Sequence, residues 1–266
     1  RNTRHQTPAV CSREHPLHLL RCKGEHCFLE INMIKRALML SAILAIGPVS
    51  YADSAADEAT PSTVAAGAPD AWQPEDGDTI NFTVLRKGKD FGRHTVRFDV
   101  ESDGSFTATT NVELKAGLGP ITVFKYELSS METWQDGQLV ALEGQTNDDG
   151  DRKAVFASLN GDTLQVAGSA YNGPAPAGII PSSHWNIREA YSSSILSTES
   201  GELLDTHVTR IGTETLTIGG EDVQATHYRL KSDLTVDLWY DDQGRWVKLG
   251  FEARGQQIDY ILNSLY

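Results

Sequence analysis

The stretch that decides the fold is VDLWYDDQGRWVKLGFEARGQQIDYIL, residues 236–262. Apolar residues recur at every second position on both sides of the turn sequence Asp242-Gln243-Gly244. Successive side chains of a strand point to opposite faces, so this period of two predicts β-strands with one dry face. The apolar set of the last four predicted strands is Tyr228, Leu230, Val236, Leu238, Tyr240, Val247, Leu249, Phe251, Ala253, Ile258, Tyr260 and Leu262. The alternate set is polar, and it places Trp246 beside Lys248.

The same alternation of apolar and polar residues extends back to Thr79. Seven β-like runs between residues 79 and 168 are joined by turns with Asp, Asn or Gly at the apex, such as Asp136-Gly137. About twelve strands cannot stay flat, because sheets twist. We therefore expect an all-β domain with one short helix, in which a large antiparallel meander curls into a barrel or half-barrel.

Composition excludes several classes of protein. The chain has 266 residues, of which 39% are hydrophobic and 22% are charged, a balance typical of a globular protein rather than a membrane bundle or a disordered chain. The formal net charge of −13 argues against a nucleic acid partner, because proteins that bind phosphate backbones carry basic patches.

Residues 33–52 resemble an export signal. Lys35 and Arg36 precede a short apolar run, residues 37–49, and Ser50-Tyr51-Ala52 supplies small residues at a cleavage site. We expect residues 33–52 to be a signal peptide cleaved near Ala52. Thirteen residues are too few for a transmembrane anchor, since a spanning helix needs about 20 residues.

Residues 1–32 show no apolar period, and we expect them to be an upstream segment translated by mistake, with Met33 as the true start. The alternative is a cytosolic extension with Cys22 and Cys27 as metal ligands, although their spacing is a weak zinc signal. Residues 53–75 are rich in Ala, Thr, Ser, Pro and Asp and predict a disordered linker. Residues 76–266 are expected to form a single β domain.

A chain that begins after Ala52 has 16 basic and 33 acidic residues and contains no cysteine. It therefore has no disulfide and no lipid-modified N-terminal cysteine. We expect a protein of the periplasm or the extracellular space, without a cofactor and with an oligomeric state that the sequence leaves open.

A loop rich in Gly and Pro, residues 171–181, interrupts the meander. Ser182 or Ser183 can cap a short helix that runs to about Tyr191, so residues 171–191 form a candidate lid over the inner face. Trp185 either plugs one end of the β shell or contacts a ligand. Candidate ligand-binding residues in and beyond this segment are Tyr171, Pro181, His184, Trp185, Trp239 and Trp246.

Four residues are candidates for acid–base chemistry: His184, His207, His227 and Asp237. If their strands pair, His207 and His227 form a metal site with Asp205 or Asp237; the alternative is a polar outer face with satisfied histidines. Residues 147–151 hold three carboxylates, which suit either a calcium ion or a solvated hairpin turn. We expect no bound metal.

Seven short segments resemble an uncharacterised family of exported bacterial β-rich proteins, known as a domain of unknown function. The resemblance covers nearly all of residues 76–266 and implies an exported β domain, but no activity, substrate or catalytic residue. The segments are ETWQDGQL (132–139), TNDDG (146–150), APAGIIP (175–181) with WN (185–186), DLWYD (237–241), GRW (244–246) and ARG (253–255).

Three functional hypotheses follow. The leading one is a non-enzymatic periplasmic binding or carrier protein that holds an apolar or amphiphilic ligand against the concave face of the sheet. The second is an envelope hydrolase acting on glycans or esters, which requires at least two of the acid–base candidates to converge in one cleft. The third is a structural or interaction module of an envelope complex, which requires an exposed apolar patch or an open strand edge.

Overall fold

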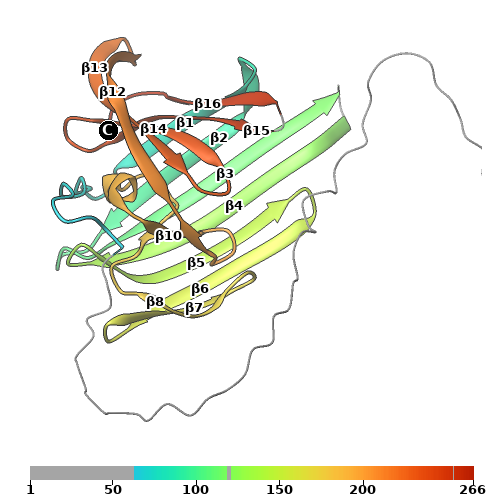
Figure 1. The fold of residues 1–266 in the computed structure, drawn as a ribbon. Coiled ribbons are helices and arrows are strands. Elements are labelled where there is room, and N and C mark those ends of the chain that lie inside the picture. The colour runs from blue at the N-terminus through green and yellow to red at the C-terminus, as the bar shows by residue number, and fades with distance from the viewer. Residues whose placement is uncertain (1–62, 119–120, 254) are drawn as a thin grey trace, which may run out of the picture. The chain divides into compact units, whose positions relative to one another are not determined.

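The computed structural model describes residues 63–118, 121–253 and 255–266 (Figure 1). The expected upstream segment and signal peptide, with the cleavage site near Ala52, lie outside the described residues. The elements of the N-terminal half are β1 (Thr79–Arg86), β2 (Lys89–Val100), β3 (Phe106–Leu118), β4 (Ile121–Gln135), β5 (Gln138–Asp148), β6 (Asp151–Asn160), β7 (Thr163–Gly168) and β8 (Asn172–Pro176). The remaining elements are β9 (Ile180–Pro181), the 3₁₀ helix η1 (Ile187–Tyr191), β10 (Ser194–Leu196), β11 (Leu203–Asp205), β12 (His207–Ile218), β13 (Glu221–Lys231), β14 (Thr235–Asp241), β15 (Trp246–Ala253) and β16 (Gln256–Leu262).

Thirteen strands form one antiparallel sheet in the order β12-β13-β14-β15-β16-β1-β2-β3-β4-β5-β6-β7-β8. Two meanders, β1–β8 and β12–β16, meet where β1 pairs with β16, with Val84 opposite Tyr260. The expected all-β antiparallel meander is therefore confirmed. The sheet does not close, because β12 and β8 are its two edges.

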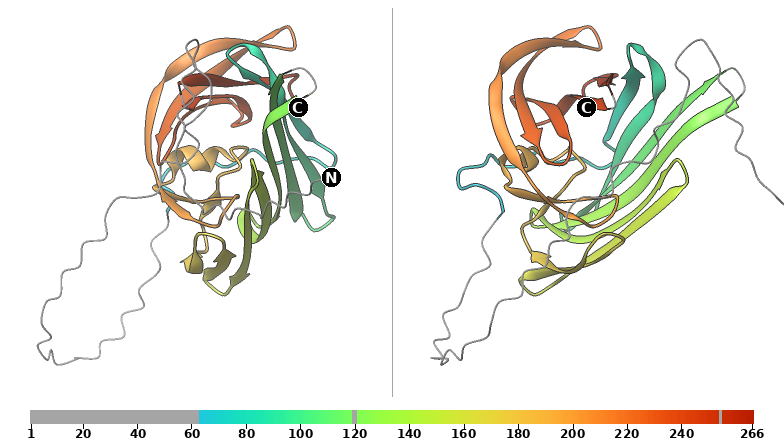
Figure 2. Two further views of the ribbon diagram at one scale, coloured as in Figure 1. Left: turned by 90° about the vertical axis from the view of Figure 1, so that its right-hand side faces the viewer. Right: turned by 45° about the vertical axis from the view of Figure 1, so that its right-hand side comes forward.

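The large sheet curls so that β12–β14 lie across from β3–β6 (Figure 2). Its inner face carries the expected alternation; β1, for example, buries Ile80, Phe82 and Val84. A second sheet, in which β10 pairs in parallel with β9 and antiparallel with β11, belongs with η1 to the segment between the two meanders. The core therefore lies inside the curled sheet, as a half-barrel requires.

Tight turns set the register of the meander. Asp136 and Gly137 between β4 and β5 both have positive φ, 50° and 73°, the conformation of a two-residue hairpin whose twist matches that of its strands. Between β5 and β6, Asn147 Oδ1 accepts a hydrogen bond from Gly150 N. The acidic segment 147–151 is thus a hairpin turn with its own internal hydrogen bond.

The short helix begins later than expected. It covers Ile187–Tyr191 as a 3₁₀ helix, and its cap is Asn186, whose side chain accepts a hydrogen bond from Arg188 N. Ser182 instead directly follows β9 of the small sheet, and its backbone N donates to Leu196 O. His184 has φ of 68°, a left-handed conformation that no right-handed helix accommodates. The expected cap at Ser182 or Ser183 is therefore wrong.

Residues 63–75 differ from the expected disordered linker. Val64 is buried and pairs with Ser192 in an isolated β-bridge. Trp72 packs edge-on against Phe98 and Tyr266, with ring centroids 5.4 and 4.9 Å apart. Two large apolar side chains in a stretch of small and polar residues are enough to attach this segment to the domain.

Candidate functional site

The most unusual feature of the inner face is a group of buried polar side chains. Seven buried side-chain polar atoms in the described part of the chain lack a hydrogen-bond partner, and six of them lie on or against the inner face of β2–β5. A buried polar group without a partner costs about 1–3 kcal/mol, so such a concentration points to a missing partner. We call these residues the inner polar belt; they are His94, Thr110, Ser130, Glu132, Thr146 and Ser183.

Strand register brings the belt together. Thr110 of β3 lies directly opposite Ser130 of β4. One row further along the same face, His94 is opposite Val112, and Thr146 is opposite Leu128. Opposed side chains on paired strands have Cβ atoms about 4.5–5.5 Å apart, so the belt residues of β2–β5 are near neighbours.

Glu132 lies at the sealed end of the belt, fully buried. Its Oε2 accepts hydrogen bonds from the indole N–H groups of Trp134 (2.9 Å) and Trp185 (3.1 Å). The Ser183 hydroxyl lies near the same carboxyl, so Oε1 of Glu132 and Oγ of Ser183 face each other, although their geometry falls short of a standard hydrogen bond. Burial raises the pKa of this carboxyl, against the effect of Ser183 and the two indoles, and the charge of Glu189 raises it further. The Glu132 carboxyl group is thus bonded to two neutral indole donors and not to a cation.

A histidine–carboxylate pair lies close by. His184 Nδ1 is 3.0 and 3.1 Å from the two carboxylate oxygens of buried Glu189, and Tyr240 donates its hydroxyl to the backbone oxygen of His184. These contacts hold His184 in its left-handed conformation.

His94 is enclosed by aromatic rings. Phe82, Trp246 and Tyr260 surround it, with ring centroids 6.4, 5.1 and 5.7 Å away. Burial, together with the charge of His184, lowers the pKa of His94 to about 3. The imidazole is therefore neutral at physiological pH and offers one donor and one acceptor.

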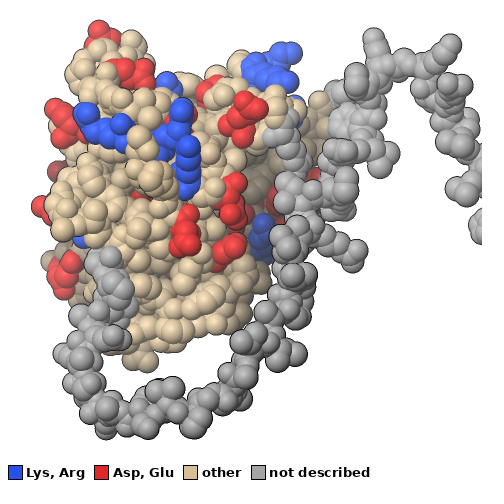
Figure 3. All heavy atoms as spheres, viewed as in Figure 1, with Lys and Arg blue, Asp and Glu red and all other residues tan. Residues whose placement is uncertain are grey.

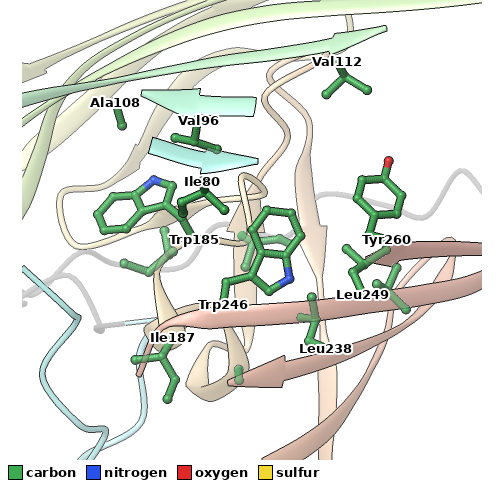
Figure 4. Packing of buried hydrophobic residues seen from close by; sticks show 14 of the residues in the cluster. Ile80, Val96, Ala108, Val112, Trp185, Ile187, Leu238, Trp246, Leu249 and Tyr260 are labelled. Atoms are coloured by element: carbon green, nitrogen blue, oxygen red, sulfur yellow. The ribbon is translucent and has the colours of Figure 1, made fainter. Parts of the chain in front are cut away.

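The inner face is sealed at one end and slightly less buried at the other, which we call the partly open end. Trp185 and Trp246 are 1% and 0% exposed; Figure 4 shows Trp185 beside Ile80 and Trp246 on the side of Leu238. Exposure rises toward the other end of the strands. The wall there is 5–8% exposed and consists of Val112, Leu114, Leu128 and Tyr260.

Tyr126, Glu199 and Lys153 form a polar network at this partly open end. Tyr126 donates its hydroxyl to Glu199 Oε1 at 2.7 Å, and Lys153 Nζ lies 3.6 Å from Glu199 Oε2. Burial, together with the charge of Glu199, raises the pKa of Tyr126 well above its usual range. The tyrosine therefore keeps its proton and remains a donor.

The candidate ligand-binding residues fall in different places. Trp185 and Trp246 are inside the shell, His184 is half-buried beside Trp246, and Pro181 is buried in β9. Tyr171 lies next to β8, where its hydroxyl donates to Pro174 O.

Trp239 and Trp246 do not form one aromatic surface. The register shifts between Trp239 and Tyr240, so that Tyr240 lies opposite Trp246 while Trp239 lies opposite Lys248. This bulge turns Trp246 inward, and the expectation that it shares the polar face with Lys248 is wrong. Trp239 points outward, where His227 stacks on it at 4.2 Å and Lys248 Nζ lies 4.1 Å from its ring.

The acid–base candidates do not converge. On the outer face, Asp237 accepts from His227 Nε2 (2.9 Å) and from Arg229 (2.8 and 2.9 Å). Figure 3 shows Lys and Arg side chains gathered where Figure 1 places β12–β14, with acidic side chains around them. His184 lies inside the shell. His207 is opposite Lys231, whereas His227 is opposite Gly212, so the two histidines are not opposite each other.

The belt residues Glu132, His94, Thr110, Ser130 and Thr146 were not among the site residues predicted from the sequence. A signal was present in residues 128–134, LSSMETW. Leu128 and Trp134 fix the inward phase of this run, and Ser130 and Glu132 are polar residues in that same phase. Polar residues at inward positions are the observation that identifies the belt.

A groove of about 500 Å³ lies over β3–β6, bordered by Ser169. Most of its walls are exposed or half-buried polar side chains that alternate with the inward residues, and inward Val112, Leu128 and Thr146 also border it, so it lies mainly over the outer face. These side chains are Asn111, Glu113, Glu127, Ser129, Gln145, Asn147 and Arg152. Glu127 is committed to Lys125 at 2.6 Å, so the groove presents no free pair of carboxylates at that point.

Within the described ranges, no three His, Cys, Asp or Glu residues are grouped to hold a metal ion. Nor is there, in the same ranges, a helix of the length and hydropathy that crossing a membrane requires. The third hypothesis asked for an open strand edge, and the large sheet has two, at β12 and β8.

Comparison with known proteins places the chain in a family. The family model for a domain of unknown function, DUF6134, matches residues 82–263, which cover nearly all of both meanders and the belt on β2–β5. The chain belongs to the DUF6134 family. This membership confirms the resemblance to a domain of unknown function.

One solved structure similar to this DUF6134 chain is the "Beta-barrel-like Protein of Domain of Unknown Function DUF1849 from Brucella abortus". The two are 10% identical, with a TM-score of 0.49, over 70% of this chain and 94% of that one. No curated protein matches the DUF6134 chain.

Proposed function

We propose that this domain is a non-enzymatic binding or carrier protein that holds an apolar or amphiphilic ligand on the inner face of its curved sheet. It acts in the periplasm or outside the cell after signal-peptide cleavage near Ala52. The observation that carries the proposal is the inner polar belt, since the buried polar atoms of His94, Thr110, Ser130 and Thr146 lack partners and are expected to meet a bound molecule.

The surroundings of the belt support an amphiphilic ligand. Val112, Leu114 and Leu128 offer an apolar wall that leads from the belt toward the partly open end. Trp185 closes the other end, so of the two alternatives that the sequence left for it, a plug and a ligand contact, we favour the plug. A ligand therefore enters beside Tyr126 and Tyr260.

The hydrolase hypothesis has less support. His184 is inside the shell, whereas His227 and Asp237 form their own pair outside it. A general acid and base must both reach one substrate, and these residues do not share a cleft.

The test is native mass spectrometry of the exported chain, purified without detergent from the periplasm or medium of its own host. We expect an added mass of a few hundred daltons that an organic extract releases. The triple variant T110V/S130A/T146V removes three belt hydroxyls at nearly constant volume, and we expect it to lose this added mass.

The matched control is T109V, because Thr109 is next to Thr110 but points outward. If the belt only holds ordered water, the wild type and both variants will show the unliganded mass, and the triple variant will be equally or more stable. That result would overturn the proposal.

A further inference from the structure

The hydrogen-bonding groups of the belt are mostly uncharged. Thr110, Ser130 and Thr146 present hydroxyls, and His94 presents Nε2 of a neutral ring. A hydroxyl both donates and accepts, so these groups match alcohol, ester or carbonyl oxygens.

The charged groups around the belt are already committed. Lys153 is paired with Glu199, and His184 with Glu189. With these two pairs formed, the described residues that form or border the belt include no free cation. An anionic headgroup would therefore lose its hydration near Glu132, Glu189 and Glu199 without gaining a partner, which is costly in a buried site.

A cationic headgroup is also disfavoured. Its partner would be Glu132, the carboxyl of the belt. Burial and the charge of Glu189 oppose the ionised form of Glu132, and the two indole donors already occupy Oε2. An ammonium group would have to ionise this carboxyl and give up its own water at the sealed end of the shell.

We infer that the inner polar belt selects an uncharged, oxygen-bearing headgroup of an amphiphile, held by His94, Thr110, Ser130 and Thr146, with the apolar chain along Val112, Leu114 and Leu128. This inference rests on the proposed function and names the class of ligand. Hydroxyl and ester oxygens satisfy the unpartnered atoms of the belt, and the chain leaves through the partly open end beside Tyr260.

The experiment compares three amphiphiles with the same twelve-carbon chain, each below its micelle concentration at pH 7.5. They are monododecanoyl glycerol, which is neutral; dodecanoate, which is anionic; and dodecylammonium, which is cationic. Binding is followed by tryptophan fluorescence, since Trp246 contacts His94, and by native mass spectrometry. We expect the neutral ligand to bind at least about tenfold more tightly than either charged one.

The variants locate the binding. T110V/S130A should weaken binding of the neutral ligand by about tenfold or more, while T109V leaves it unchanged. Circular dichroism and thermal unfolding show that each variant is folded.

The outcomes separate the two claims. Equal or tighter binding of dodecanoate or dodecylammonium overturns the inference and leaves the proposed function standing. Binding of the neutral ligand that T110V/S130A does not weaken also overturns the inference, because the headgroup then lies elsewhere. Failure of all three amphiphiles to bind, together with an unliganded mass for the protein from its own host, overturns both.

Discussion

The indole N–H of Trp185 donates a 3.1 Å hydrogen bond to Oε2 of Glu132, a residue 53 positions earlier in the chain. The contact joins the segment between the meanders to the middle of β4. It gives Trp185 two roles, since the ring fills the sealed end of the shell and its polar edge satisfies a buried carboxyl. The inner face is therefore organised around a polar group as well as around apolar packing.

The first prediction concerns the protonation of Glu132. Its native pKa is raised above the ordinary 4.5, so the folded protein is most favoured below that pH and loses stability as pH rises toward the native pKa. E132Q imitates the neutral carboxyl. The free energy of unfolding of the wild type should therefore fall relative to that of E132Q by about 1.4 kcal/mol per pH unit between pH 4.5 and the native pKa. Urea titrations of both proteins from pH 4 to 8 measure this difference.

The matched control for this prediction is E143Q. Glu143 lies on the neighbouring strand β5 but is exposed. Its substitution should leave the pH profile of stability unchanged. Parallel profiles for E132Q and the wild type would show that Glu132 is ionised in the folded protein and would contradict the prediction.

The second prediction concerns His94. Its pKa is about 3 in the folded protein and 6.5 ordinarily, so the unfolded chain binds a proton below pH 6.5 that the native state does not. The wild type should lose about 1.4 kcal/mol of stability per pH unit as pH falls from 6.5 toward 3. H94L should lose less over this interval than the wild type, as measured by denaturant titrations at pH 7.5, 5.5 and 4.5.

His184 contributes to this acid sensitivity, because its charge acts on His94. The control is H207L, since His207 is exposed. If H94L and H207L change the loss of stability below pH 6.5 equally, His94 is not the buried group that causes this loss.

Much of the fold could be predicted from the sequence, because strand alternation is local information. The dry face of β14 was assigned correctly at Val236, Leu238 and Tyr240. Trp246 was assigned to the wrong face because a bulge adds one residue to the strand and reverses the phase. Nothing in the composition of the segment marks a bulge.

The site could not be predicted for a different reason. Glu132 is a site residue because Trp185 donates a hydrogen bond to its carboxyl group. The position of Trp185 depends on how residues 177–201 pack between the meanders. Its inward phase was visible in the sequence, but whether a buried carboxyl is paired depends on contacts between segments far apart in the chain. The belt is therefore a property of tertiary structure.

The third prediction concerns the contact between the inner face and the loop that carries Glu199. A Cβ atom at Gly144 would overlap the backbone oxygen of Thr198. G144A should therefore displace this loop, destabilise the protein by about 1–3 kcal/mol and weaken the contacts of Glu199 with Tyr126 and Lys153. Thermal unfolding measures the first effect, and hydrogen exchange at residues 197–201 measures the second.

The control for this loop contact is G212A, since a Cβ atom at Gly212 meets nothing within 4 Å. That variant should unfold within about 0.5 kcal/mol of the wild type. Equal stability of G144A and G212A would mean that the loop moves aside without cost.

The last prediction separates the outer face from the inner one. Asp237 is bonded to Arg229 and His227; burial alone would raise its pKa, but these two partners outweigh burial and lower it below the ordinary 3.8. Its contribution to stability is therefore present above pH 3.8 and is lost as pH falls through the native pKa. D237N should lower the free energy of unfolding by about 0.2–1 kcal/mol at pH 7, a range that reflects the partial exposure of the pair.

D237N should also leave binding of monododecanoyl glycerol unchanged, because Asp237 and the belt lie on opposite faces of the sheet. D233N, at an exposed loop position, is the control for stability. A loss of ligand binding in D237N without unfolding would place the ligand on the outer face beside Trp239.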